Sequence, residues 1–285
     1  MSNPVILCAD STCDLNEELL RACNVHLYPF HIVLEDKTYQ DGIDLCPDDI
    51  VRIYREKKVL PHTAAINVQE YIDFFTPFVN AGCDVIHISL GSGISSSHQN
   101  SCLAAAEFDG RVHTINSGNL STGSGHLVLE AAARIEKGLP ADQIAAELRE
   151  LTSKVSSSFV LDTLEFLYKG GRCSALSMMG ANLLKLKPCI RVDNADSKMG
   201  VGKKYRGSLE KAIEDYIRDE LQGRDDIRLD KIFVTHSPID QSYVDAAVNA
   251  VKSYQNFENI YITDAGCTIT SHCGPGCLGI LYMVK

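Results

Sequence analysis

The chain has 285 residues, of which 45% are hydrophobic and 22% are charged, and its formal net charge is −10. This length favours two domains over one small core, and the composition is that of an ordinary globular protein. The negative charge argues against non-specific binding to nucleic acid or to an anionic membrane, because both need a basic surface.

The first half of the chain alternates extended apolar runs with helical patterns. Strands are predicted at residues 5–9, 26–34, 84–90 and 112–116, and helices at 67–81, from about 125 to 136, and at 140–154. Polar turns follow most of these strands. The repeated order of strand, polar turn and helix predicts a parallel sheet with crossover helices.

The second half has a different pattern. Strands are predicted at residues 158–164, 187–193, 200–205, 231–235, 259–263 and 277–284, with helices at 176–185, 208–221 and 240–254. Residues 194–199 have the composition of a hairpin connection, residues 168–172 form a glycine-containing turn, and residues 268–276 form a turn or a short helix.

These patterns predict an α/β protein of two domains. Residues 1–157 would form an N-terminal domain with a mainly parallel sheet flanked by helices. Residues 158–285 would form a C-terminal α/β sandwich with a mixed sheet. No stretch approaches the roughly 18 apolar residues that a membrane helix needs, and the first apolar run is too short for a signal peptide. The 11 cysteines are expected to be reduced thiols in a cytoplasmic protein.

The turn at residues 91–97 stands out among the strand-to-helix turns. Capping alone would explain hydroxyl residues at the turns 10–12 and 117–124. Here Gly91 and Gly93 are expected to let the backbone approach a ligand. The hydroxyls outnumber those that a single cap uses, and they belong to Ser92, Ser95, Ser96 and Ser97. An oxyanion would be stabilised at such a helix start by hydroxyl and amide hydrogen bonds.

Other chemistries fit this sequence less well. The turn lacks the third glycine of a dinucleotide-binding loop, and no P-loop occurs. The Gly-x-Ser-x-Gly elbow is absent, although a Ser–His pair stays open because the chain has 9 histidines. His272, Cys273 and Cys277 cluster near Cys267, but no second cysteine pair completes a zinc site, so thiol packing is favoured and no metal is predicted.

Two further segments carry polar groups beside glycines. Residues 168–172 place Arg172 after a glycine pair, which suits either a bidentate carboxylate contact or a surface salt bridge. Residues 270–276 place His272 in a turn rich in glycine and proline. Each segment alone favours a structural role, and their co-occurrence with the serine-rich turn indicates a site.

Together these residues resemble the DegV family of bacterial fatty-acid-binding proteins, which serve as acyl-binding subunits of fatty acid kinase. The resemblance runs nearly end to end. It is carried by residues 10–12, Thr63, 91–99, 116–117, 168–172, 184–188 and 272–276. It implies two α/β domains with an acyl chain, such as that of palmitate or oleate, buried between them. It also implies a carrier without a catalytic nucleophile or cofactor, whose partner is the catalytic subunit of a fatty acid kinase.

The resemblance implies a role for each candidate site residue. The fatty acid carboxylate would be held by Thr63 and Ser95, with Ser92, Ser96 and Ser97 around them. Arg172 and His272 would lie near the head group. The chain departs from the family pattern after Thr63, where residues 64–67 read AAIN instead of Ser-Gln-Pro-Ser, and at Asn116, where an aspartate is common.

Two alternatives stay open at this point. One is a serine hydrolase that uses a hydroxyl of residues 92–97 with a histidine. The other is a phosphotransfer protein with His272 as the acceptor, for which the sequence shows no dedicated acidic partner.

Overall fold

The computed structural model describes residues 3–173 and 186–285, so the helix predicted at 176–185 lies outside the described residues. The N-terminal part contains a four-stranded parallel sheet in the order β2-β1-β6-β7. Its strands are β1 (Val5–Asp10), β2 (Val25–Tyr28), β6 (Asp84–Ser89) and β7 (Val112–Asn116). Its helices are α1 (Glu17–Ala22), α3 (Val68–Asn80), α4 (Ser97–Ala105), α5 (Thr122–Glu136) and α6 (Ala141–Leu151), with short 3₁₀ turns at Ser11–Cys13, Ala106–Phe108 and Thr152–Lys154.

The second sheet is mixed and has the order β10-β9-β8-β13-β11-β12. Only β11 and β12 run parallel, and the other neighbours are antiparallel. Its strands are β8 (Val155–Leu161), β9 (Leu186–Val192), β10 (Met199–Arg206), β11 (Ile227–His236), β12 (Asn259–Asp264) and β13 (Cys277–Val284). The helices of this part are α7 (Glu165–Gly170), α9 (Leu209–Leu221), α10 (Gln241–Tyr254) and α11 (Cys267–Cys273).

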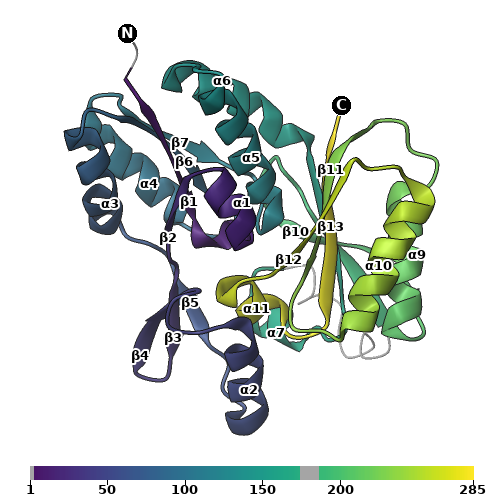
Figure 1. Ribbon diagram of the computed structural model, residues 1–285. Coiled ribbons are helices and arrows are strands. Elements are labelled where there is room, and N and C mark those ends of the chain that lie inside the picture. The colour runs from purple at the N-terminus through teal and green to yellow at the C-terminus, as the bar shows by residue number, and fades with distance from the viewer. Residues whose placement is uncertain (1–2, 174–185) are drawn as a thin grey trace.

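The two sheets stack with helices between them (Figure 1). Helices α3 and α4 cover one face of the parallel sheet, and α5 and α6 cover the other. The mixed sheet follows, and α9 and α10 cover its far face. Leu127 and Val128 of α5 are fully buried in one cluster with Ile86 of β6 and Leu281 of β13. A single helix therefore packs against both sheets, and the apolar area that it buries holds the two parts together.

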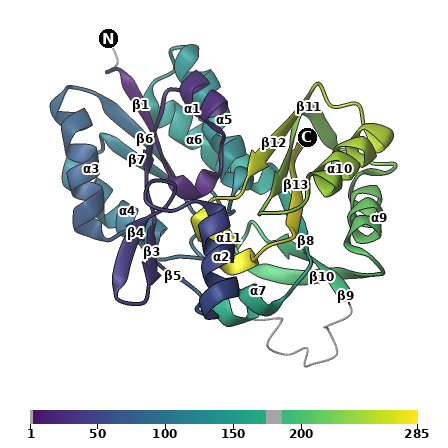
Figure 2. The same ribbon diagram turned by 60° about the horizontal axis from the view of Figure 1, so that its bottom comes forward.

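A small antiparallel sheet lies apart from the two main sheets. It has the order β4-β3-β5, with β3 (His31–Leu34), β4 (Lys37–Gln40) and β5 (His62–Ala64), and α2 (Pro47–Lys57) follows β4. Figure 2 shows α2 next to α7 and α11 of the C-terminal part. The sequence did not predict this sheet or α2.

The structure confirms the predicted fold class: a parallel sheet flanked by helices, followed by an α/β unit with a mixed sheet. The prediction of one strand at 26–34 was wrong, because β2 ends at Tyr28 and β3 begins at His31 in another sheet. Pro29 has no N–H to donate to a neighbouring strand, so the strand ends before it. The turn predicted at 168–172 is the end of α7, with Gly171 in the left-handed conformation at its C-cap.

The hairpin predicted around residues 194–199 is present, since β9 and β10 pair antiparallel across it. The short helix α11 occupies most of the segment 268–276. The predicted domain boundary near residue 157 falls within β8 and stays a prediction.

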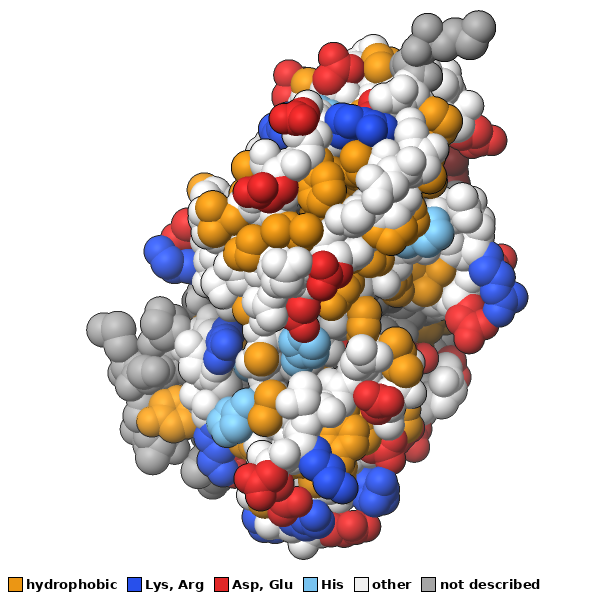
Figure 3. Space-filling model, turned by 90° about the vertical axis from the view of Figure 1, so that its left-hand side faces the viewer, with side chains coloured by type: hydrophobic (Ala, Val, Ile, Leu, Met, Phe, Trp, Pro, Cys, Tyr) orange, Lys and Arg blue, Asp and Glu red, His pale blue; other side chains and the backbone are white. Residues whose placement is uncertain are grey.

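Charged side chains of both signs are interspersed on the face that carries α3, without a continuous basic surface there (Figure 3). No helix among residues 3–173 and 186–285 is long and apolar enough to cross a membrane.

Candidate functional site

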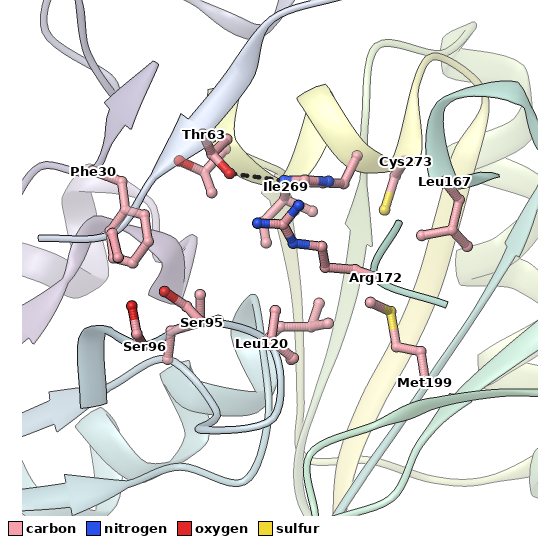
Figure 4. A pocket seen from close by; sticks show the side chains of 15 residues that line it. Phe30, Thr63, Ser95, Ser96, Leu120, Leu167, Arg172, Met199, Ile269 and Cys273 are labelled. Atoms are coloured by element: carbon pink, nitrogen blue, oxygen red, sulfur yellow. Dashed lines mark hydrogen bonds between the residues drawn. The ribbon is translucent and has the colours of Figure 1, made fainter. Parts of the chain in front are cut away.

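A cavity of about 280 Å³, here called the central cavity, lies between the N-terminal and C-terminal parts. Figure 4 shows walls from both sides, with Phe30, Thr63, Ser95 and Ser96 facing Leu167, Met199 and Cys273. Most of its lining is apolar: Phe30, Ala65, Leu90, Ile94, Leu120, Leu167, Met199, Ile269 and Cys273. The polar lining residues are Thr63, Ser95, Ser96, Arg172, Thr268 and His272. The cavity thus combines an apolar wall with a few hydroxyls, which is the usual make-up of a small-molecule site.

The cavity lies near the point where the strand order of the parallel sheet reverses. The strands that follow β1 in the sequence lie on both sides of it, β2 on one side and β6 on the other. Ligands of such sheets bind outside the carboxyl ends of the strands at this point. Here the buried carboxylate of Asp10, the last residue of β1, lies at this end of the sheet. It accepts hydrogen bonds from the Tyr71 hydroxyl (2.7 Å) and the Leu90 N–H (2.8 Å) and lies 3.1 Å from His87 Nε2.

The turn at residues 10–12 therefore organises the protein rather than the cavity. The Ser11 hydroxyl donates to Asp41 (3.0 Å) and accepts the N–H of Phe30 (3.1 Å). None of the residues of this turn lines the central cavity. Through Phe30, however, Ser11 fixes one apolar side chain of the cavity wall.

Two carboxylates of the N-terminal part hold the start of α11. Asp14 accepts the N–H of Gly266 (2.9 Å), and Asp41 accepts the N–H of Cys267 (2.8 Å). These are N–H groups that a helix leaves without internal partners, and a negative charge is favoured beside them. Burial raises the pKa of Asp14 well above its ordinary range, against the opposing hydrogen bonds from Ser121 and Gly266. The contacts fix the helix that delivers His272 to the cavity.

Thr63 and His272 meet at one end of the cavity. Thr63 Oγ1 lies 2.9 Å from His272 Nε2, although the two residues are 209 positions apart in the sequence. Burial, with Arg172 and His62 nearby, lowers the pKa of His272 to about 4. The ring is therefore neutral at pH 7, so Thr63 and His272 offer neutral polar atoms beside the Arg172 guanidinium. A β-carbon at Gly170 would lie 2.4 Å from His272 Nδ1, so only glycine leaves room for the ring there.

The serines of the turn 91–97 have different surroundings. Ser95 and Ser96 line the cavity. Ser96 is the N-cap residue of α4, yet its side chain makes no capping bond, so its hydroxyl is available to a ligand. Ser95 Oγ accepts the N–H of Ser97 (3.2 Å) and lies 3.0 Å from Ser97 Oγ.

The other two serines lie away from the cavity. Ser97 is fully buried, and its hydroxyl accepts the N–H of Ile66 (3.2 Å). Ser92 is exposed, and its N–H and hydroxyl bond the side chain of Asn116 (3.1 and 2.9 Å). The structure thus brings two of the four serines to the cavity and gives the other two structural contacts.

The glycines of this turn serve a different purpose from the expected one. A β-carbon at Gly93 would lie 1.9 Å from the carbonyl oxygen of Asp196, and one at Gly91 would lie 2.8 Å from Ser197 Cβ. The expectation that they let the backbone approach a ligand was wrong. They let the turn pack against the connection between β9 and β10.

Arg172 lies at the mouth of the cavity and is exposed. Figure 4 shows its side chain extending toward Thr63. Its Nη1 donates to the carbonyl of Gly170 (2.8 Å). The surface salt bridge considered as an alternative for Arg172 is not among the ion pairs of the described residues.

Sequence reasoning did not single out Thr268. Its side chain lines the cavity, and its buried Oγ1 has no hydrogen-bond partner among the described residues. Thr268 and His272 are four positions apart on α11 and therefore lie on one helix face. That spacing was a usable signal. Nothing in the local pattern pointed to Met199 or Leu120, which complete the apolar wall.

The hydrogen bonds of the cavity bear on the serine hydrolase alternative. Within the described chain, no hydrogen bond joins a hydroxyl of residues 92–97 to a histidine. No carboxylate orients His272, since its Nδ1 has no partner among residues 3–173 and 186–285. Residues 3–173 and 186–285 contain no group of three or more His, Cys, Asp or Glu side chains placed to hold a metal ion. The geometry favours binding of a ligand with an apolar body and an oxyanion end.

Known proteins resemble this chain over its whole length. A DegV domain-containing protein of Caldanaerobacter subterraneus subsp. tengcongensis is 27% identical over 283 residues, covering 99% of each chain. The solved structure described as "Fatty Acid Binding of a DegV family Protein from Thermus thermophilus" superposes with a TM-score of 0.88 at 28% identity, covering 100% of both chains. A fatty acid binding DegV family protein from Streptococcus agalactiae shares the fold, with a TM-score of 0.86 at 24% identity and 99% coverage of each chain.

The family model supports the same relationship. The model described as "Uncharacterised protein, DegV family" matches residues 5–285, which include both sheets and every wall of the central cavity. The chain belongs to the DegV family.

Proposed function

We propose that this protein binds a long-chain fatty acid in the central cavity, with the carboxylate at the end formed by Thr63, Ser95 and Ser96. The observation that carries the proposal is the composition of the cavity wall, which is mostly apolar and contains neutral hydroxyls but no Asp or Glu. The fatty acid binding described for the Thermus thermophilus relative supports the same ligand class.

Physical estimates fit this ligand. Burial of a chain of about 16 carbons, at roughly 0.8 kcal/mol per methylene, supplies on the order of 10 kcal/mol before the costs of binding. The chain can therefore provide the affinity. A few hydroxyls and the Arg172 guanidinium then suffice to orient the carboxylate, and no lysine has to be buried beside it.

Native mass spectrometry tests the ligand class. The protein is delipidated, then mixed with palmitate or oleate, and we expect a complex of one fatty acid per chain. Absence of any bound fatty acid, both in the purified protein and after reloading, would falsify the proposal. A fluorophosphonate probe run in parallel checks the serine hydrolase alternative, and we expect no labelling.

Ser95→Ala tests the carboxylate contact. Loss of one hydrogen bond to a charged group should weaken fatty acid binding by about 1–3 kcal/mol. Isothermal titration calorimetry with palmitate measures the change. Ser253→Ala is a matched control, because its hydroxyl bonds a carbonyl within α10, far from the cavity. Equal affinities of the wild type and Ser95→Ala would show that Ser95 serves only the start of α4.

We further propose that the bound fatty acid is presented to the catalytic subunit of a fatty acid kinase in the cytoplasm. In that reaction a carboxylate oxygen attacks the γ-phosphorus of ATP, the bond to ADP breaks, and an acyl phosphate forms on this protein. Support comes from the exposed Arg172, which keeps the head-group end accessible. Hydroxylamine converts acyl phosphates to hydroxamates. A kinase, ATP and the loaded protein should yield palmitoyl hydroxamate, and the delipidated protein should yield none.

A further inference from the structure

A second pocket, of about 450 Å³ and here called the edge pocket, lies beside β7, the outermost strand of the parallel sheet. Residues of α4, of β7 and of the end of α6 contribute to its wall. It shares no lining residue with the central cavity, so the proposed function does not account for it. None of the described residues that line it is acidic, although the protein carries a net charge of −10.

The thiol of Cys102 borders the edge pocket between a histidine and a hydroxyl. Cys102 lies one helical turn after His98 on α4, and its Sγ is 3.5 Å from His98 Nε2. On its other side, Thr114 Oγ1 of β7 lies 3.1 Å from the same sulfur. Cys102 is partly exposed, so a small molecule in the pocket can reach the sulfur.

The hydrogen bonds around His98 fix the place of its proton. The Ser89 hydroxyl donates its one hydrogen to the carbonyl of Ile115 (3.1 Å). Ser89 Oγ therefore has to accept from His98 Nδ1, which lies 2.8 Å away. Burial is the main cause that lowers the pKa of His98, and the ring is neutral at pH 7. A neutral imidazole carries one N–H, so Nε2 has the lone pair that accepts the thiol proton of Cys102.

The surroundings of the sulfur also favour its anionic form. Arg149 lines the edge pocket, is exposed, and takes part in no ion pair within residues 3–173 and 186–285. The Thr114 hydroxyl is placed to donate to a sulfur anion. A nearby cation and a donor stabilise a thiolate, which is the nucleophilic form of cysteine. The same cation attracts anionic reagents to the pocket.

Cys46 provides the contrast within the same chain. It is more exposed than Cys102, but its Sγ donates to the Asp49 carboxylate (3.1 Å). A neighbouring carboxylate opposes ionisation of a thiol and repels anions. Burial raises the pKa of several other thiols, those of Cys8, Cys13, Cys189, Cys267 and Cys277. Exposure alone would therefore select Cys46 as the most reactive thiol, whereas the local chemistry selects Cys102.

We propose that Cys102 is a modification site that forms a mixed disulfide with a small anionic disulfide. His98 accepts the thiol proton as Sγ attacks one sulfur of the reagent. The bond between the two reagent sulfurs breaks, a new S–S bond to Cys102 forms, and the leaving thiolate takes the proton from His98. The reagent is the oxidant, so one half of it stays on the protein and the other half leaves as a thiol. This reaction goes beyond the proposed function and needs no bound fatty acid.

The experiment compares two disulfides that differ in charge. Dithiobis(nitrobenzoate) carries a carboxylate on each half, and dithiodipyridine is neutral. Each is mixed with the native protein, the released thiol is followed by absorbance, and mass spectrometry of peptides assigns the modified cysteine. The variants are Cys102→Ser, His98→Gln and Arg149→Gln. The matched controls are Cys46→Ser, which removes the more exposed thiol, and Arg55→Gln, which removes an exposed arginine of α2 outside the edge pocket.

We expect Cys102 to react with the anionic disulfide about tenfold faster than any other thiol of the native protein, because its thiolate is favoured. This fast phase should disappear in Cys102→Ser and persist in Cys46→Ser. His98→Gln should slow the reaction with both disulfides. Arg149→Gln should slow only the anionic disulfide, by about threefold, the effect of one exposed charge. Arg55→Gln should react like the wild type.

Two results would contradict different parts of the inference. A fast phase that persists in Cys102→Ser, or that mass spectrometry assigns to Cys46, would overturn the modification site. Equal rates of Arg149→Gln and the wild type with the anionic disulfide would overturn the preference for an anion. Palmitate binding is measured on the same preparations and should be equal in Cys102→Ser and the wild type, so a failure of the proposed function is recognised separately.

Discussion

At the scale of single residues, two buried histidines make the stability of the protein depend on pH. His126 of α5 is completely buried, and its Nε2 lies 3.0 Å from the carbonyl oxygen of Leu281 in β13. Burial lowers its pKa from 6.5 to about 4. His272 has a similar shift, also caused mainly by burial. In both residues the folded protein binds a proton less readily than the unfolded chain does.

Lowering the pH should therefore destabilise the fold through His126. The unfolded chain takes up the proton as pH falls through 6.5, whereas the folded protein takes it up only near pH 4. Between pH 7.5 and 5.0 this residue alone should lower the free energy of unfolding by about 2 kcal/mol. Urea denaturation at both pH values measures the loss. His126→Gln keeps a donor for Leu281 and should reduce the pH-dependent loss by that amount, and an undiminished loss in this variant would contradict the assignment.

The residue scale also shows what the sequence could reveal of the site. Glycine and hydroxyl content indicated the turn 91–97, but composition does not fix where each side chain points. Ser97 is turned into the core and Ser92 toward Asn116, because each finds a hydrogen-bond partner there. The contact of Thr63 with His272 joins positions 209 residues apart, which no local pattern can predict.

At the scale of elements, the strand and helix periods predicted most of both main sheets. The small sheet escaped prediction because its strands are short and pair over long range, as when Ile32 of β3 faces Thr63 of β5. Its contribution is nevertheless direct, because it places Thr63 at the cavity. The turn before α4 owes its position to another element, the connection between β9 and β10.

Gly93→Ala should push the turn before α4 away from the connection between β9 and β10. The added β-carbon would lie 1.9 Å from the Asp196 carbonyl oxygen, so the backbone has to shift. We expect the free energy of unfolding to fall by about 1–3 kcal/mol, as in overpacked sites. Palmitate affinity should fall too, because Ser95 moves with the turn. Gly200→Ala is the matched control, since a β-carbon at Gly200 meets no atom within 4 Å. Wild-type stability of Gly93→Ala would show that the contact is dispensable.

At the scale of the whole molecule, the central cavity belongs to neither part alone. Thr63 and Ser95 come from the N-terminal part, and Leu167, Met199 and His272 from the C-terminal part. A ligand in this position contacts both parts, so its binding free energy should stabilise both. The hydrophobic cluster around α5 favours the same coupling, because in it α5 packs against both β6 and β13.

Hydrogen exchange should reveal this coupling. Palmitate at 100 times its Kd stabilises the folded state by about 2.7 kcal/mol. We expect slower amide exchange in β5 and at the start of α4, and equally in α7 and α11. Mass spectrometry of peptides from the free and loaded protein measures the change. Protection confined to the N-terminal segments would show that the ligand does not engage the second wall.

The place of β13 in the mixed sheet has a consequence for biosynthesis. This strand lies between β8 and β11, although it follows both in the chain. During translation β8 and β11 therefore emerge from the ribosome before the strand that separates them, and each has an unpaired edge until β13 arrives. The preceding helix α11 carries His272. The nascent chain can complete neither the sheet nor the cavity wall, so ligand capture has to follow the synthesis of residues 267–284.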